Sequence, residues 1–290
     1  MGADRPDDFD VPGFGDSSDD SVQPRSRVAV EERDRFEYWA DLRAAVAADS
    51  WAVVAERFRG QWASHCERWP ASSGRAADRS GDPPGSWRGD GGHYLGTAAN
   101  AEVEKRCEGI AEVERDVVSP AMREIEACDP ERRLVGFDHR LKGLDRIKEK
   151  VAADVLYKSR TPEQALINVK DTVRYTFQYS EAAYTEAVCA DIGRLRERGF
   201  ELVELRNSWT DSHYRGINSR WRESATGQLF EAQFHTQTSY EAKQLTHAAY
   251  ERLRNPVTLD SERDELEVFQ EGVCEQIPIP RNATNIPDFP

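Results

Sequence analysis

The alternation of apolar and polar residues in the stretch 229–235 predicts a β-strand with two different faces. The apolar face holds Phe230, Ala232 and Phe234, and the polar face holds Glu231, Gln233 and His235. One face can therefore enter a core, while the opposite face presents a carboxylate, an amide and an imidazole in one row. We interpret this row as a rigid support for a metal ion or a hydroxyl nucleophile; the alternative is the ordinary polar surface of a half-buried sheet.

Similar patterns along the segment 131–254 predict helices alternating with strands. The expected helices are 140–156, one that begins after a Thr161 cap with Pro162 at its first position, 180–198 and 239–254. The expected strands are 171–179, 200–205, 214–221 and 229–235. Strands interrupted by single helices indicate an α+β fold in which a mixed β-sheet is flanked by helices.

The rest of the chain divides by composition. We expect a disordered acidic leader at 1–27, a helical N-terminal region at 28–70 and a flexible linker at 71–92, in which Trp87 is the residue able to dock elsewhere. The domain with the sheet then occupies 93–254 and begins with a long charged helix from 96 to about 128. Residues 255–290 follow as a short acidic helix and a proline-rich tail.

Charge and hydropathy narrow the classes of function. The 290 residues carry a net charge of −14, so the chain as a whole has no electrostatic footprint for nucleic acid or an anionic membrane. No apolar run approaches the ~20 residues of a membrane span, and Met1 to Asp20 lack a secretory apolar core. Five scattered cysteines fit reduced thiols. These features predict a cytoplasmic protein.

A group of cations precedes the first strand of this domain. On the expected helix, Lys142, Arg146 and Lys150 lie four residues apart on one face, where like charges cost a few tenths of a kcal/mol per pair. An anion such as a polyphosphate would compensate this repulsion. The alternative is a solvated face that Asp145 and Glu149 neutralise.

Two further clusters carry candidate chemistry. Asp171 opens a strand and, beside Glu231, could hold Mg²⁺, although pairing with Arg174 is the simpler explanation. On another expected strand, Tyr214 could stack on a base while Gly216 permits close backbone approach, or Tyr214 could pack on its own sheet.

Taken in order, these four clusters resemble the RelA/SpoT-type nucleotidyltransferase family, which contains alarmone synthetases and small toxin-like relatives. The family pattern runs Arg-x-Lys-x3-Ser-Ile-x2-Lys, an Asp opening a strand, Gly-Tyr-x-Ser-x-His, and Glu-x-Gln-x-Arg-Thr. It falls on Arg140, Lys142, Ile147 and Lys150, then Asp171, then Tyr214, then Glu231, Gln233 and Thr236. The resemblance covers about 135–254. This chain departs from the pattern at Arg146, Thr176, His213, Gly216, Asn218 and His235.

The resemblance implies a Mg²⁺-dependent transfer of the β,γ-pyrophosphate of ATP to the 3′-hydroxyl of a purine nucleotide, giving a product of the ppGpp or ppApp type. It assigns the donor phosphates to Arg140, Lys142, Arg146, Lys150 and Arg174. Asp171 and Glu231 become the catalytic and metal-binding carboxylates, with Glu231 either the base or a second ligand. It assigns binding of the acceptor nucleotide to Tyr214, Asn218, Gln233, His235 and Lys243.

The departures on the acceptor side leave the acceptor open. One alternative is pyrophosphorylation of the 3′ end of tRNA, for which Arg215, Arg220, Arg222 and Lys243 would form a local basic patch. Another is a catalytically inactive nucleotide-binding module. Toxin-like relatives also raise the expectation of a growth-inhibiting toxin with a neutralising antitoxin, whereas the N-terminal helices and leader have no assigned role.

Overall fold

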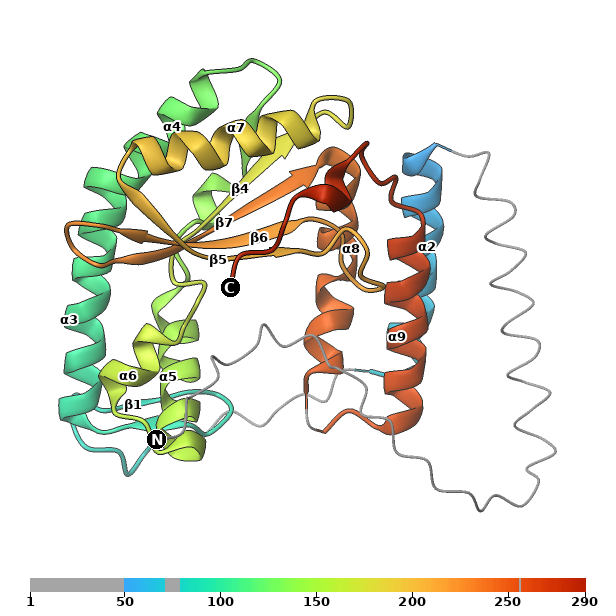
Figure 1. Ribbon diagram of the computed structural model, residues 1–290. Helices are drawn as coiled ribbons and strands as arrows, with labels where there is room; N and C mark the ends of the chain where they lie inside the picture. Colours follow the sequence, from blue (N-terminus) through green and yellow to red (C-terminus); the bar gives the residue numbers. More distant parts are fainter. Residues whose placement is uncertain (1–49, 71–78, 256) are drawn as a thin grey trace, which may run out of the picture. The chain divides into compact units, whose positions relative to one another are not determined.

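A five-stranded sheet forms the centre of the domain (Figure 1). The computed structural model describes residues 50–70, 79–255 and 257–290, so the expected acidic leader and residues 28–49 lie outside the described residues. The strands run in the order β3 (Arg133–Val135), β4 (Arg174–Tyr179), β7 (Leu229–Thr236), β6 (Ile217–Glu223) and β5 (Phe200–Asn207). Strands β4 and β7 are parallel and the other neighbours antiparallel, so the expected mixed sheet is confirmed.

Helices flank this sheet. They are α2 (Trp51–Arg68), α3 (Thr97–Val113), α4 (Ser119–Ala127), α5 (Leu144–Lys158), α6 (Pro162–Ile167), α7 (Tyr184–Glu197), α8 (Gln237–Leu253) and α9 (Asp260–Glu275). A π-helical turn, Glu114–Val118, joins α3 to α4, which together form the long charged helix expected from 96. Thr161 caps α6 through a reciprocal pair of bonds with Gln164, as its sequence predicts. Short 3₁₀ turns cover Phe137–His139 and Ala283–Asn285.

The apolar face of β7 enters the core as predicted. Phe234 stacks on Phe177 of β4 with ring centroids 6.0 Å apart, and its carbonyl accepts a 2.8 Å bond from the Tyr184 hydroxyl of α7. Helix α7 therefore covers this face. The interior on this side is aromatic, in keeping with the enrichment of aromatic residues in β-strands that pack on a core.

The polar face of β7 is also buried, which corrects the expectation of an outward row. Glu231, Gln233 and His235 are 7%, 5% and 0% exposed. The reason is tertiary: α8 follows β7 directly and folds back over it, so that Lys243 bonds to Gln233 and Ser239 to His235. A row of polar groups held away from water calls for internal partners.

The expected helix at 140–156 begins later than predicted. Arg140 ends the 3₁₀ turn, and the residues that follow pair with the chain leading into β4: Lys142 N–H donates to Thr172 O (3.0 Å), Arg174 N–H donates to Arg140 O (2.8 Å), and Leu141 bridges Val173. Helix α5 starts only after Gly143. Lys142 is therefore not on the helical face with Arg146 and Lys150, because the sheet provides hydrogen bonds to its backbone.

Three other boundaries differ. Strand β4 starts at Arg174 rather than 171, and β6 starts at Ile217, which leaves Tyr214 in the preceding loop. Within the range expected as a linker, residues 79–92 are built into the domain: strand β1 (Trp87–Arg88) pairs with β2 (Tyr94–Leu95). Trp87 packs on the core formed by α3, α5 and α6, which holds this segment in place.

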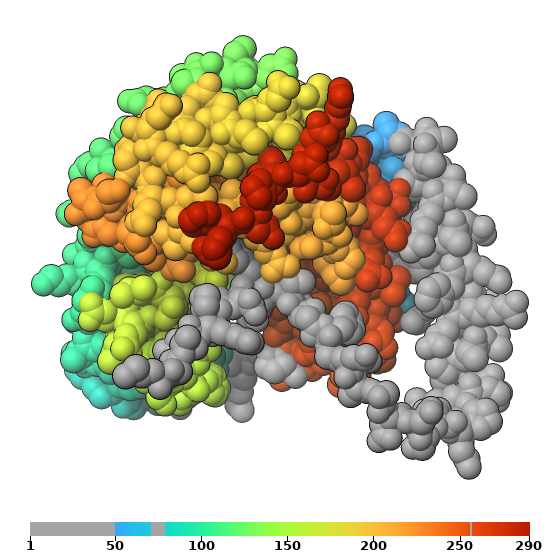
Figure 2. All heavy atoms as spheres, viewed as in Figure 1, coloured from blue at the N-terminus to red at the C-terminus, as the bar shows by residue number. Residues whose placement is uncertain are grey.

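The C-terminal segment runs along the outer strand of the sheet. The expected acidic helix is α9, which is longer than predicted. After α9, the C-terminal segment, drawn in dark red in Figure 2, crosses the surface to β5. Leu205 and Phe289 exchange two backbone hydrogen bonds of 2.9 Å each. The tail thus covers part of an edge that would otherwise be open. In the part of the chain that the structure describes, every helix is too short or too polar to cross a membrane.

Candidate active site

The two candidate acidic residues lie near the starts of two neighbouring parallel strands, β4 and β7. Glu231 N–H donates a 2.9 Å bond to Val173 O, and Glu231 is the register partner of Arg174. Asp171 precedes Val173 by two residues in the turn that leads into β4. Parallel pairing of β4 with β7 therefore brings together two acidic residues that lie 231 − 171 = 60 positions apart in the sequence.

Asp171 is held by two lysines. Lys142 Nζ lies 2.6 Å from Oδ2 and Lys150 Nζ lies 3.0 Å from Oδ1. Burial by itself would raise the pKa of this carboxyl, but the ammonium groups of Lys150 and Lys142 prevail and lower it to about 2. Asp171 is thus ionised at neutral pH in a cationic setting that suits anionic ligands.

Glu231 has the opposite environment. Burial raises the pKa of its carboxyl, and the charge of Asp171 acts in the same direction. The cations of Arg174 and Lys243 and a 2.7 Å bond from Gln233 Nε2 oppose the shift without cancelling it. A carboxylate whose proton affinity is raised is better suited to accept a proton than an ordinary surface glutamate.

Lys243 reaches the same polar face from α8. Its ammonium group donates to Gln233 Oε1. Burial, together with the charge of Arg174, lowers the pKa of Lys243 to about 7, while the charge of Glu231 acts in the opposite direction. The site therefore contains a lysine whose charge changes near neutral pH.

A chain of hydrogen bonds holds the acceptor-side residues together. The Tyr214 hydroxyl donates to Asn218 Oδ1 (2.8 Å) and lies 2.8 Å from His235 Nε2, and His235 Nδ1 lies 2.9 Å from Ser239 Oγ. With its single proton given to Asn218, Tyr214 accepts from Nε2–H of His235, and Nδ1 accepts from Ser239. The imidazole is then neutral, in agreement with a His235 pKa that burial lowers well below its usual range.

Gly216 makes room for this imidazole. A Cβ atom at Gly216 would lie 2.8 Å from Cε1 of His235, and the backbone of Gly216 has a φ of 152°. Glycine is the residue that tolerates both conditions. The two departures from the family pattern, at 216 and 235, are therefore neighbours in space.

Arg140 and Arg146, which the sequence assigns to the donor phosphates, have surroundings that differ from those of Lys142 and Lys150. Arg140 Nε lies 2.7 Å from Glu114 Oε1, a buried carboxylate that also accepts from Tyr175 and Ser119. Arg140 is thus tied to the π-helical turn rather than to Asp171. Arg146 is exposed on α5.

Asp145 and Glu149, the residues expected to neutralise the basic face, are engaged by the β1–β2 hairpin. Trp87 Nε1 donates a 2.8 Å bond to Asp145, and His93 contacts Glu149. A Cβ atom on Gly89 would collide with Glu149. The sequence assigns this stretch to a linker, but it also indicates Trp87 as a residue able to dock elsewhere, and Trp87 does so on Asp145.

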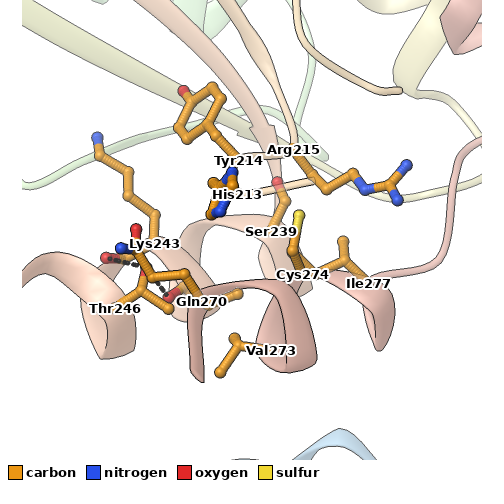
Figure 3. A pocket seen from close by; sticks show the side chains of 11 residues that line it. His213, Tyr214, Arg215, Ser239, Lys243, Thr246, Gln270, Val273, Cys274 and Ile277 are labelled. Atoms are coloured by element: carbon orange, nitrogen blue, oxygen red, sulfur yellow. Dashed lines mark hydrogen bonds between the residues drawn. The ribbon is translucent and has the colours of Figure 1, made fainter. Parts of the chain in front are cut away.

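The structure adds residues that the sequence did not indicate. A small pocket beside Tyr214 and Lys243 is closed by α9 (Figure 3). Its lining also comprises His213, Arg215, Ser239, Ala242, Thr246, Gln270, Val273, Cys274 and Ile277. Helix α9 lies outside the segment with family-like motifs, and its sequence indicates only a short acidic helix.

The cations proposed as a tRNA patch are largely engaged with protein groups. Arg222 pairs with Glu201 at 2.8 Å, Arg220 donates to Ile167 O, and Arg215 donates to Trp209 O. Of these three contacts, the one between Arg222 and Glu201 joins a cation to a carboxylate, whereas the other two orient guanidinium groups without neutralising them.

The carboxylates suit a hard cation of the magnesium type. Among the described residues, no group of three or more His, Cys, Asp or Glu side chains is arranged to hold a metal. Mg²⁺, however, is commonly bound through one or two carboxylates, with water and substrate phosphates completing the shell. Asp171, ionised and only partly buried, and Glu231 fit this requirement.

Comparisons with known proteins found similar structures only. No protein-family model and no curated protein sequence matches the chain. The small alarmone synthetase 1 from Bacillus subtilis bound to its product pppGpp is 14% identical, covers 64% of this chain and 96% of its own, and has a TM-score of 0.43. A GTP pyrophosphokinase family protein from Streptococcus pneumoniae is 15% identical, covers 58% and 83%, and has a TM-score of 0.36. At such low identities and TM-scores, we draw no conclusion about activity from these likenesses.

Proposed function

We propose that this protein is a pyrophosphokinase that transfers the β,γ-pyrophosphate of ATP to the 3′-hydroxyl of a purine nucleotide. The observation that carries the proposal is the placement of Asp171 and Glu231 near the starts of adjacent parallel strands, between donor-side cations and an acceptor-side polar network. Phosphoryl-type transfer requires chiefly positioning and charge stabilisation, and this arrangement provides both.

The triphosphate of ATP would lie along the donor side. Lys142 and Lys150 already hold one anionic group, Asp171, and Arg174 stands opposite Glu231. Arg146 is exposed on the same helix as Lys150 and is free to extend the binding surface outward. Arg140 contributes by fixing the extended segment that carries Lys142, since its guanidinium is anchored on Glu114.

Magnesium would be held by Asp171, with Glu231 as a second ligand where it does not act as the base, and would neutralise charge on the transferring group. Binding phosphates and a cation at Asp171 exchanges the lysine–carboxylate pairs for lysine–phosphate pairs. The low pKa of Asp171 keeps that carboxylate ionised for the purpose.

The acceptor would lie on the other side, between the loop before β6 and helix α8. Glu231 is positioned to take the proton of the attacking 3′-hydroxyl, because burial raises its proton affinity. Tyr214 would support the base, with its hydroxyl fixed by Asn218 and His235. Gln233 orients both Glu231 and Lys243 through its two amide atoms.

The test is incubation of the purified protein with ATP labelled in its terminal phosphates, Mg²⁺ and separate pools of GDP, GTP, AMP, ATP and tRNA. Label should move to a purine nucleotide. Transfer to tRNA alone would assign the 3′ end of tRNA as acceptor, and transfer to none of them would contradict the proposal. An active protein that arrests growth on expression would in addition support the role of a toxin, with an antitoxin as partner.

Glu231→Gln provides the sharpest variant. It keeps the shape of the side chain but removes the proton-accepting charge, so transfer should fall by about two orders of magnitude or more. Its thermal stability should be unchanged or higher, since an ionised carboxylate in a buried position is costly. Glu201→Gln, on the exposed side of β5, is the matched control and should keep full activity.

A further inference from the structure

The turn that carries Asp171 connects α6 to β4. The chain leaves α6 at Ile167 and then enters β4 (Figure 1), and we refer to residues 167–171 as the Asp171 turn. Val169 and Thr172 are buried, whereas the Asp171 side chain that lies between them is 19% exposed. The position of this carboxylate therefore depends on the contacts that hold the turn.

Arg220 of β6 holds the first end of the Asp171 turn. Its Nη2 donates a 2.9 Å bond to the carbonyl of Ile167, the last residue of α6. The final carbonyl groups of a helix lack partners within the helix, so a guanidinium group beside them is a fitting donor. Because the Ile167 side chain is mostly exposed, this bond ties the end of α6 to the sheet through the backbone.

Glu204 of β5 contacts the same turn three residues further along. Its Oε2 lies 3.5 Å from Lys170 Nζ, and both side chains are about one quarter exposed. Glu204 and Arg220 are register partners on adjacent antiparallel strands, so their side chains lie next to each other on one face of the sheet. Two neighbouring residues of the sheet thus contact two points of the turn that precede Asp171.

The same face of the sheet carries the second candidate carboxylate. Arg220 is the register partner of Glu231 on one side of β7, as Arg174 is on the other side. Residues directly opposite each other on antiparallel strands have Cβ atoms roughly 5 Å apart. Arg220 therefore lies beside Glu231 and is bonded to the turn that carries Asp171, so it connects the two acidic residues.

The guanidinium group of Arg220 lies between two carboxylates. Burial lowers the pKa of Arg220, whereas the charge of Glu204 and, more weakly, that of Glu231 raise it. Desolvation of a cation is costly, and one bond to a carbonyl adds little stability in return. The position that Arg220 gives to the turn explains its placement better than a gain in stability does.

The contacts of the Asp171 carboxylate cannot hold the turn throughout the proposed reaction. Lys142 and Lys150 bind this carboxylate in the free protein, and they exchange it for phosphate groups when ATP binds. Arg220 and Glu204 contact the turn at other atoms, the Ile167 carbonyl and the Lys170 ammonium, which that exchange leaves unchanged.

We propose that Arg220 is a positioning residue of the pyrophosphate transfer. Together with Glu204, it forms a clasp that holds the Asp171 turn and keeps Asp171 in place relative to Glu231 when phosphate groups displace its two lysine partners. This inference rests on the proposed function. It gives Arg220 a role within the site instead of on a surface for tRNA.

Arg220→Met tests the proposal, because it removes the donor and the charge but keeps a long side chain on β6. A displacement of about 1 Å at a reacting group is costly, so kcat should fall about tenfold or more. The KM for ATP should rise, and the KM for the acceptor should stay unchanged. Arg220→Lys keeps the charge and a donor and should restore part of kcat. An unchanged kcat in Arg220→Met would overturn the inference.

Arg222→Met is the matched control. Arg222 lies two residues further along β6 on the same face of the sheet, and its partner is Glu201 at 2.8 Å. The variant should keep kcat and both KM values. If it lost as much activity as Arg220→Met does, the loss of positive charge on β6 would explain the effect, and the clasp would be excluded.

Thermal melts establish that the variants are folded at the assay temperature. If Arg220→Met unfolds, Glu204→Gln decides, because it keeps the shape of the side chain and removes the charge that attracts Lys170. Partly exposed ion pairs are weak, so this variant should lower kcat by a smaller factor, about threefold. An unchanged kcat in Glu204→Gln would then overturn the inference.

Hydrogen exchange separates this inference from the proposed function, because the measurement requires no activity. Amides in the peptide 167–173 should exchange about tenfold faster in Arg220→Met than in the wild type, and Arg222→Met should match the wild type. If no acceptor receives pyrophosphate, the proposed function fails and this measurement alone decides on the clasp. Faster exchange confined to this peptide supports the clasp; exchange that is unchanged, or equally faster throughout the chain, overturns it.

Discussion

Asp171 and Glu231 show how two like residues acquire different properties from their neighbours. Lysines on both oxygens keep Asp171 ionised, whereas burial raises the proton affinity of Glu231. Pairs of carboxylates whose pKa values are driven apart are typical of acid–base sites. The roles that we propose for them, a charged ligand and a base, would therefore follow from their surroundings.

The charge of Lys243 should control acceptor binding near neutral pH. Its pKa of about 7 means that the ammonium form is lost as the pH rises above 7, so the KM for an anionic acceptor should increase between pH 7 and 9. Lys243→Arg keeps its charge throughout and should give a flat profile. The measurement is acceptor KM against pH for both proteins; the same rise in Lys243→Arg would exclude this lysine as its cause.

The same shift has a consequence for stability with a definite sign. The folded pKa of Lys243 lies below the unfolded value of 10.5, so the unfolded chain binds the proton first. The contribution of Lys243 to stability is therefore full above pH 10.5 and declines as the pH falls from there to about 7.

Lys150 and Arg140, both assigned to donor phosphates from the sequence, should differ when replaced by alanine. Lys150 is half exposed, so Lys150→Ala should weaken ATP binding and leave the thermal melt nearly unchanged. Arg140→Ala leaves the buried Glu114 carboxylate with one partner fewer and should lower stability by about 1–3 kcal/mol. ATP titration and chemical denaturation of both variants check this; equal effects on folding would contradict the distinction.

At the level of elements, the loop before β6 depends on its contact with β7. Gly216→Ala would place a Cβ atom against His235 and strain a backbone at φ 152°. It should lower stability by about 1–3 kcal/mol and raise the KM for the acceptor more than that for ATP, because Tyr214 moves with the loop. Gly227→Ala also has a positive φ but meets no atom within 4 Å. Gly227→Ala should lower stability without changing the KM for the acceptor. If it raised this KM as much as Gly216→Ala does, backbone strain alone would explain the effect, and the contact with His235 would have no part in it.

The sequence predicted the helices and strands that have a strong hydrophobic period. Its predictions were wrong where contacts with distant parts of the chain determine the backbone conformation. Strands β5 and β7 and helices α7 and α8 agree with their patterns to within a few residues. Strand β3 has only three residues, too few to show a period. The 140–142 segment was assigned to a helix because its cations continue the spacing of α5, while its hydrogen bonds to β4 are long-range.

The site was predicted to a similar degree. Pairing of β4 with β7 places Asp171, in the turn before β4, and Glu231, near the start of β7, in neighbouring parts of the sheet, and the sequence pattern locates both strands. The burial of the polar row was not predictable, since it depends on how α8 packs back onto β7. The contribution of α9 to the pocket beside Tyr214 was not predictable either, because it depends on how α9 packs against α8 and the loop before β6.

At the level of the whole molecule, the C-terminal tail should keep the sheet from pairing with other chains. Asn207 Nδ2 donates to Ala283 O and Ile286 O at 2.8 Å each, and Phe289 pairs with Leu205. Deleting 283–290 would expose the edge of β5, so the shortened protein should self-associate more than the full chain as concentration rises. Light scattering over a concentration series measures this.

A milder change serves as the control for that deletion. Phe289→Ala keeps the two backbone bonds to Leu205 and removes only a partly exposed ring. It should scatter like the full chain. If the deletion variant also does so, the tail has no protective role.

The π-helical turn at Glu114–Val118 affects how the side-chain faces of α3 and α4 are oriented relative to each other in the continuous rod that they form. Such a turn behaves as one residue inserted into an α-helix. The extra residue is absorbed within the turn, because a π-helix turns less per residue than an α-helix, so α4 keeps nearly the phase of an uninterrupted helix. Removing one residue from the turn should therefore close it to regular α-helix with α4 in place, although it would move Glu114, which accepts from Tyr175 and Arg140. Removing one residue elsewhere in α3 or α4 would rotate everything beyond it by about 100°. The rod should accordingly accept a deletion within 114–118 more readily than at any other point of its length.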